Sequence, residues 1–152
     1  MMAFDYMTRF DHMAKANAGR EALVALNASA AFNRWAGFEL GAVAPGAVEL
    51  RLPWRDDLGQ YTGFLHAAMI GAMIDTACGF AAYNQVGNVL ASHFSVNCLA
   101  PATGEFFIAR ARIVKAGRKQ VFAAAELFAG RGGVERLVAT GEAILIPVDS
   151  ST

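Results

Sequence analysis

The most constraining feature of this chain is an apolar stretch that begins near Leu65 and ends at Tyr83, in which Asp75 is the only formally charged residue. The stretch is rich in alanine and methionine, contains no proline and is long for a strand, so it predicts a helix from about Ala67 to Tyr83. Because this helix is apolar nearly all round, it must be enclosed on most sides. An unpaired buried carboxylate costs on the order of several kcal/mol, so we expect Asp75 to have a function.

Runs with the character of β-strands precede and follow this helix. Short turns separate them, which favours antiparallel neighbours over helical crossovers. The chain before them, from Phe10 to Phe32, is alanine-rich and predicts one or two short helices. The expected fold class is therefore α+β, a long central helix wrapped by a six-stranded antiparallel sheet. The expected strands cover Ala36–Val43, Ala47–Leu52, Val89–Leu99, Glu105–Lys115, Lys119–Ala129 and Arg136–Ile146.

Helical spacing divides the predicted helix into a side of small residues and a side of bulky ones. We expect the bulky side to pack on the sheet, and the small side, next to Asp75, to admit another backbone or a slender ligand. Two glycines inside the helix cost about 1 kcal/mol each relative to alanine, which favours such a close approach. The small side holds Ala68, Gly71, Ala72, Cys78, Gly79 and Ala82, and the bulky side holds Met69, Ile70, Met73, Ile74, Phe80 and Tyr83.

Composition limits the classes of function. The chain has 152 residues, of which 55% are apolar and 17% charged, with a formal net charge of zero. These values indicate one globular domain that hides apolar surface in an oligomer or a ligand tunnel. They argue against a nucleic-acid partner. The chain shows neither a membrane span nor an apolar leader, so we expect a cytoplasmic protein.

The start of the predicted helix offers hydrogen-bond donors. The backbone N–H groups of His66, Ala67 and Ala68 lack partners within the helix and lie at its positive end, where they can stabilise an oxyanion. The His66 side chain could equally cap the helix or fix the loop. For Asp75 the alternative is a structural role, bonded to a backbone or hydroxyl group.

Other reactive side chains give weaker indications. Cys78 and Cys98 have no metal-ligand spacing, and a disulfide is not expected. Cys78 has no evident base, so we expect a small core residue rather than a nucleophile. Trp35, Trp54 and the phenylalanines are expected in the core and in interfaces. Neither a metal nor a cofactor is predicted.

Four segments resemble the hotdog thioesterases of the phenylacetate-degradation type. They are Gly63–Ala68, Asp75–Ala82, Phe94–Ala102 and Val114–Arg118. The resemblance covers about residues 35–147 and implies a hotdog domain there, with an N-terminal helical segment at 1–34 and a disordered tail at 148–152. It implies an enzyme that hydrolyses an acyl-CoA and assembles as a homodimer or as a tetramer, a dimer of dimers.

The resemblance also implies roles for single residues. Asp75 would be general base or nucleophile across the subunit interface, and the backbone N–H of Ala67 would bind the thioester oxygen. His66 would match the family's histidine, and Gln60 would orient the attacking water or the aspartate. Three departures are alanines for glycines at Ala67 and Ala68, a glutamine at Gln60 for the commoner asparagine, and Ala91 where a serine or threonine is usual. The expected substrate-binding residues are Ala68, Ser92, Arg118 and Lys119.

These substrate-binding roles and the activity have alternatives. Arg118 and Lys119 would contact the phosphates of coenzyme A, or would simply be solvated residues of a turn. A non-catalytic acyl-CoA binding module is the alternative function. A hotdog hydratase is disfavoured because the chain lacks an Asp-x-Asn-Pro-x-His pattern.

Overall fold

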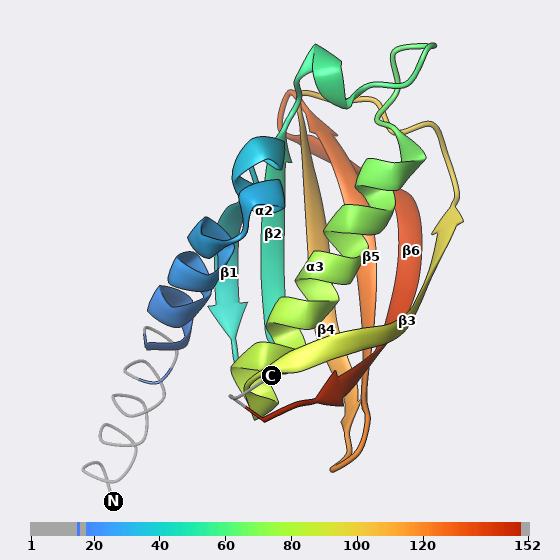
Figure 1. Cartoon of the computed structure of the whole chain (residues 1–152). Helices are drawn as coiled ribbons and strands as arrows, with labels where there is room; N and C mark the ends of the chain where they lie inside the picture. The colour runs from blue at the N-terminus through green and yellow to red at the C-terminus, as the bar shows by residue number, and fades with distance from the viewer. Residues whose placement is uncertain (1–14, 16–17, 150–152) are drawn as a thin grey trace, which may run out of the picture.

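The central helix α3 (Ala67–Val86) lies across one face of an antiparallel sheet in a computed structural model that describes residue 15 and residues 18–149 (Figure 1). The sheet has six strands in the order β1-β2-β4-β5-β6-β3. The α+β prediction and the order of elements along the chain are confirmed. The strands are β1 (Glu39–Ala44), β2 (Ala47–Pro53), β3 (Val89–Cys98), β4 (Phe106–Ala116), β5 (Val121–Arg131) and β6 (Val134–Pro147).

Alternation of side chains explains why these runs form a sheet with one buried face. In β2, Val48, Leu50 and Leu52 are buried, whereas Glu49 and Arg51 lie on the other face. The predicted turn at Pro45-Gly46 joins β1 to β2, and Gly46 has a φ of +67°, which glycine adopts without steric cost. A short 3₁₀ helix, η1 (Asp56–Leu58), follows β2 and was not predicted from the sequence.

Strand β3 forms one edge of the sheet. It pairs antiparallel with β6 along Val89–Cys98, and within the described chain no strand pairs with its other side. Exposed apolar side chains lie on this edge strand, with Leu90 58% and Phe94 47% exposed. An open edge of this length with apolar residues is a surface that another strand can pair with.

Helix α3 buries most of its bulky side, as predicted, but Tyr83 is only half-buried and lines the cavity of Asp75. The prediction for the small side is corrected as well. Cys78 and Ala82 are fully buried, because they lie on the side of α3 that faces the sheet. The prediction that the helix is enclosed on most sides is confirmed for residues 69–84, none of which is exposed. The side left partly open is formed by Ala68, Ala72, Asp75, Thr76, Gly79 and Tyr83.

The two helical glycines do not mark a close approach inside the protomer. A Cβ on Gly71 would lie 3.4 Å from the ring of Phe94, and one on Gly79 would lie 3.9 Å from Leu145. Both are ordinary contact distances, so packing within one protomer does not require glycine at either position. The predicted approach of another backbone to this side of α3 stays a prediction.

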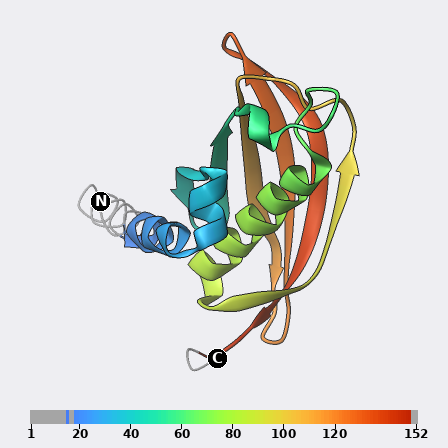
Figure 2. The same ribbon diagram turned by 45° about the horizontal axis from the view of Figure 1, so that its top comes forward.

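The N-terminal segment lies on the same side of the sheet as α3 (Figure 2). Residues 18–29 are helical, which confirms that part of the prediction, and α2 (Ala31–Ala36) follows. Gly37, with a φ of +84°, ends α2, so the strand predicted from residue 36 begins at Glu39. The predicted tail lies mostly outside the described residues. None of the described helices is both long and apolar enough to cross a bilayer.

Candidate active site

The first turn of α3 leaves one backbone donor free. His66 is the N-cap, and its ring Nδ1 accepts a hydrogen bond of 2.9 Å from the N–H of Ala68. The N–H groups of Met69 and Ile70 both donate to the carbonyl of His66, at 2.9 and 3.1 Å. Among the described residues, the N–H of Ala67 has no acceptor. This N–H is therefore available to a ligand, at the positive end of the helix.

The same hydrogen bond orients the His66 ring. Because Nδ1 accepts, the proton of the neutral ring is on Nε2, which points a donor away from the backbone. The sequence left a capping role open for this side chain, and the structure shows that it caps.

Gln60 lies beside Ala67. Its side-chain Oε1 accepts hydrogen bonds from the hydroxyl and the backbone N–H of Thr62, which leaves the amide NH₂ group as a donor. Gln60 and Ala67 line one cleft of about 390 Å³ between the start of α3 and the chain after β3, together with Phe64, Leu65, Ile70 and Cys98–Ala102. The structure therefore brings these two predicted residues together.

Asp75 lies in a different cavity, farther along α3. This cavity, of about 330 Å³, also contacts Asn33 of α2, Thr76 and Tyr83 of α3, and Ala91 of β3. The carboxylate makes no hydrogen bond or ion pair within the described part of the chain. A purely structural role, satisfied by internal bonds, is therefore not what the protomer shows. Burial raises the pKa of Asp75, which makes its carboxylate a better base.

One protomer does not bring Asp75 and Ala67 to the same reacting atom. They are eight residues apart on one helix, and a rise of 1.5 Å per residue separates them by about 12 Å along its axis. They also line different cavities. A carbonyl group bound at Ala67 would therefore lie out of reach of the Asp75 carboxylate of the same chain.

The remaining predicted residues are dispersed. His66 and Ala68 line a third cleft, of about 370 Å³, with Phe32 and Trp35 of α2. Ser92 lies on a bulge of β3 and donates to the carbonyl of Ile144 at 3.3 Å, whereas its neighbour Ala91 lines the Asp75 cavity. Phe32 and Trp35 were expected in the core or in an interface. They lie outside the core of the protomer, 49% and 53% exposed, and their place in an interface stays a prediction.

Arg118 and Lys119 are far from the first turn of α3. They lie in the turn between β4 and β5, at the opposite end of the sheet from His66 (Figure 1). Within one protomer they do not join the cleft of Gln60 and Ala67.

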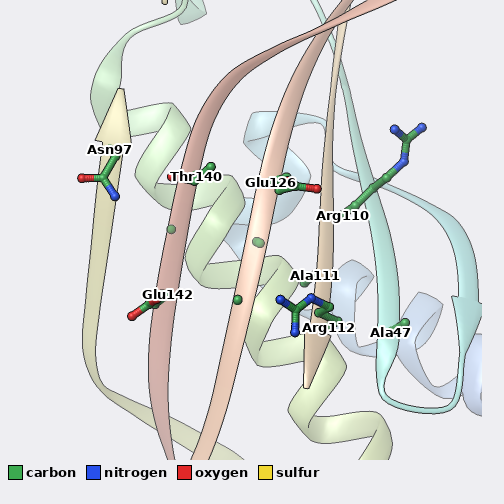
Figure 3. A pocket seen from close by; sticks show the side chains of 11 residues that line it. Ala47, Asn97, Arg110, Ala111, Arg112, Glu126, Thr140 and Glu142 are labelled. Atoms are coloured by element: carbon green, nitrogen blue, oxygen red, sulfur yellow. The ribbon is translucent and has the colours of Figure 1, made fainter. Parts of the chain in front are cut away.

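The outer face of the sheet has a hollow of its own, of about 460 Å³ (Figure 3). Its lining includes Arg110, Arg112 and Glu142, and none of the predicted site residues. Arg110 is paired with Glu49 at 3.0 Å and with Glu135 at 2.7 Å, so its charge is already neutralised.

Cys78 is excluded as a nucleophile by its surroundings. The side chain is fully buried. Burial, and secondarily the charge of Asp75, raise the pKa of the Cys78 thiol to about 12. The described residues contain no group of three or more His, Cys, Asp or Glu that could hold a metal ion.

Comparison with known proteins gives the family. The model of the thioesterase superfamily matches residues 62–135. A thioesterase family protein from Silicibacter pomeroyi is 38% identical, with a TM-score of 0.79 over 87% of this chain and 96% of that one.

More distant solved structures share the fold. The E. coli PaaI protein from the phenylacetic acid degradation operon is 15% identical, with a TM-score of 0.78 over 88% of this chain and 96% of that one. A conserved protein from Pseudomonas aeruginosa is 22% identical, with a TM-score of 0.72 over 78% and 94%. No curated protein matches the chain. From the match over 87% of its length, this chain belongs to the thioesterase superfamily and has the hotdog fold.

Proposed function

We propose that this chain hydrolyses acyl-CoA thioesters at a site shared by two copies, with Asp75 of one copy acting on a carbonyl held by Ala67 of the other. The observation that carries the proposal is the free N–H of Ala67 beside Gln60, together with the position of Asp75, the predicted base, about 12 Å farther along the same helix. The carboxylate must then come from elsewhere, and the same residue of a second copy can supply it.

The chemistry follows from these three groups. The N–H of Ala67 and the helix dipole stabilise negative charge on the thioester oxygen. The amide NH₂ of Gln60 holds the attacking water, or the incoming aspartate. Asp75 takes the proton as the water oxygen bonds to the acyl carbon, or attacks that carbon itself. The C–S bond then breaks, and coenzyme A leaves as a thiolate that needs no strong acid. Where Asp75 itself attacks, the acyl group is left on its carboxylate as an anhydride, which water then hydrolyses to the free acid and the regenerated Asp75.

The second copy is expected at strand β3. Its outer edge is unpaired in the described chain, and the exposed Leu90 lies on it. Leu90 and Ala91 also line the Asp75 cavity, so a strand added there would extend the wall of that cavity. Antiparallel pairing of two β3 strands relates the two copies by a two-fold axis. The second α3 then runs in the opposite direction, which carries its Asp75 toward the first copy's Ala67.

A mixing experiment tests the shared site. Asp75→Asn removes the base, and Ala67→Pro removes the free N–H, so each variant alone should release little thiol from acyl-CoA. A mixed dimer contains one intact site, so an equimolar refolded mixture should recover about a quarter of wild-type activity. No recovery in verified mixed dimers would contradict the shared site. Binding of acyl-CoA without thiol release by the wild-type protein would instead indicate the non-catalytic module.

A further inference from the structure

We propose that Phe32 and Trp35 of α2 form the wall of an acyl pocket that favours apolar acyl groups longer than acetyl. The inference rests on the proposed thioester hydrolysis and adds the residues that select its substrate. Both side chains lie outside the residues that match the superfamily model. They are about half exposed, on a helix that packs beside α3, and the fold itself leaves their exposure unexplained.

The cleft they line adjoins the candidate site. Phe32 and Trp35 face His66, Ala68 and Met69 across a volume of about 370 Å³. That volume is within the range of small-molecule pockets. The cleft of Gln60 and Ala67 lies next to it, on the same first turn of α3.

A thioester bound at this turn can place one substituent of its carbonyl carbon in each cleft. The carbonyl carbon carries two substituents, the acyl chain and the sulfur of coenzyme A, which leave it in different directions. With the oxygen at the N–H of Ala67, one arm enters the Gln60 cleft and the other the Trp35 cleft. The aromatic walls and the side chain of Met69 suit the apolar arm, which is the acyl group.

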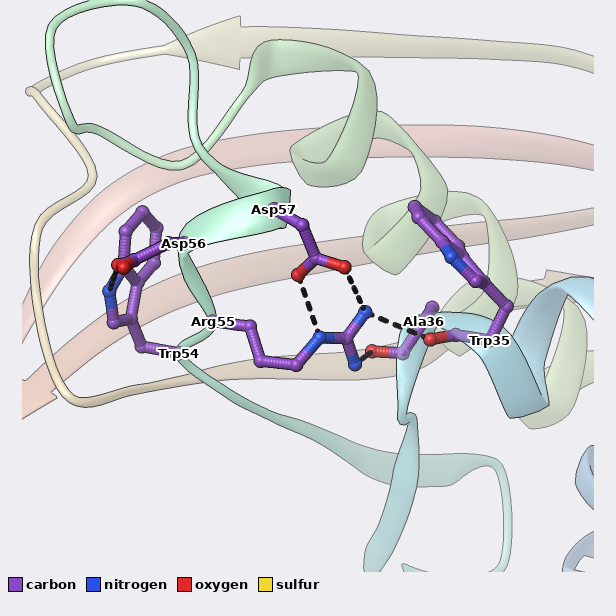
Figure 4. Close-up of polar contacts among 6 residues, drawn as sticks. All are labelled: Trp35, Ala36, Trp54, Arg55, Asp56 and Asp57. Carbon is purple, nitrogen blue, oxygen red and sulfur yellow. Dashed lines mark hydrogen bonds and ion pairs between the residues drawn. The ribbon is translucent and has the colours of Figure 1, made fainter.

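The aromatic wall is held in place before a ligand binds. Arg55 donates to the carbonyl of Trp35 at 2.9 Å and to that of Ala36 at 3.0 Å, and its guanidinium lies 5.7 Å from the Trp35 ring (Figure 4). The Nε of Arg55 also donates to the carboxylate of Asp57, at 2.8 Å.

A second set of contacts holds the other aromatic side chain. The Phe32 ring lies 5.8 Å from that of Trp35 and packs edge-on against Phe38 at 6.0 Å. A wall fixed in this way lowers the entropy cost of binding.

The test compares kcat/KM for acetyl-, hexanoyl-, decanoyl- and phenylacetyl-CoA in the wild type, Trp35→Ala and Phe32→Ala. The ratio of kcat/KM for hexanoyl-CoA to kcat/KM for acetyl-CoA should fall about tenfold in each variant, which is the size expected for lost apolar contacts. Decanoyl- and phenylacetyl-CoA show whether a chain or a ring loses more. Val114→Ala is the matched control, because Val114 is 58% exposed on β4, away from these clefts. Its ratio should stay at the wild-type value.

Two further measurements keep the test decisive. Arg55→Lys retains the charge but not the paired donors, so it should lower the same ratio even if Trp35→Ala fails to fold. If the wild type shows no turnover, the hydrolysis proposal fails, and calorimetric binding of hexanoyl-CoA and acetyl-CoA to Asp75→Asn, with and without Trp35→Ala, still tests the pocket. An unchanged preference, in turnover or in binding, would overturn it.

Discussion

The ring Nδ1 of His66 accepts the backbone N–H of Ala68 at 2.9 Å, so the side chain that begins α3 also decides which N–H of its first turn stays free. We expect His66→Ala to lower the free energy of unfolding by about 1 kcal/mol through loss of the cap. His66→Ser should restore the cap. Chemical denaturation gives stability, and thiol release gives kcat/KM.

The serine variant separates the two roles of His66. If the ring only caps the helix, His66→Ser keeps wild-type turnover. If the Nε2 donor also contacts substrate, stability returns while kcat/KM stays low.

Ala67 can lose its N–H with little disturbance of the helix. It is the first residue of α3, where proline is favoured, and His66 before it has the extended conformation that precedes proline (φ −61°, ψ 138°). Ala67→Pro should therefore lower kcat by about 10²- to 10³-fold, as for loss of an oxyanion donor, with an unchanged melting temperature. Ala67→Ser keeps the N–H and serves as the control. Full activity in Ala67→Pro would remove this group from the mechanism.

The raised pKa of Asp75 links activity and stability to pH. Because burial raises it, the acid limb of kcat/KM should lie above the ordinary range of an aspartate. The folded state holds the proton more tightly than the unfolded state, so this residue lowers stability as pH rises from its ordinary pKa through the raised one. Asp75→Asn should therefore be inactive and more stable at neutral pH.

This stability gain should vanish below a pH of about 3.9, where Asp75 is protonated in the unfolded state as well as in the folded state. Thermal melts from pH 3 to 8 measure it. A lower melting temperature for Asp75→Asn at pH 7 would contradict the assignment of an unpaired carboxylate.

If two copies associate through β3, a substitution that weakens the dimer should lower activity as well. Leu90→Asp places a charge on the exposed edge strand, beside the cavity of Asp75. We expect it to shift the dimer toward monomer in analytical ultracentrifugation and to lower specific activity in parallel, while circular dichroism is unchanged. Val134→Asp, on an exposed residue at the start of β6, is the control. Full activity in a monomeric variant would show that one chain suffices.

The two thiols should differ sharply in reactivity. Cys98 is exposed, whereas Cys78 is buried and its pKa is raised to about 12. An aromatic disulfide reagent should modify one thiol per native chain and the second only in denaturant. Cys98→Ser should abolish the fast reaction. Rapid modification of both thiols would mean that α3 separates from the sheet.

Periodicity by itself determined most of the fold. The lone charge in Leu65–Tyr83 predicts a buried helix, and the alternation of Val48, Leu50 and Leu52 predicts a half-buried strand. Both can be predicted because apolar residues recur along the sequence with the period of the element that buries them. The ends shift by a few residues, as at Gly37, where a left-handed conformation extends α2 beyond the predicted start of a strand.

Only the tertiary structure decided how the candidate residues are grouped. The sequence selects Gln60, Ala67 and Asp75 as a set, but their grouping depends on which cavity each faces. It could not show that Ala68, rather than Ala67, loses its N–H to His66. Nor could it show that Trp35 lies half exposed in the cleft of His66 and Ala68. The contacts that place it there join α2, Arg55 and the start of α3, which are far apart in the sequence, so no local pattern records them.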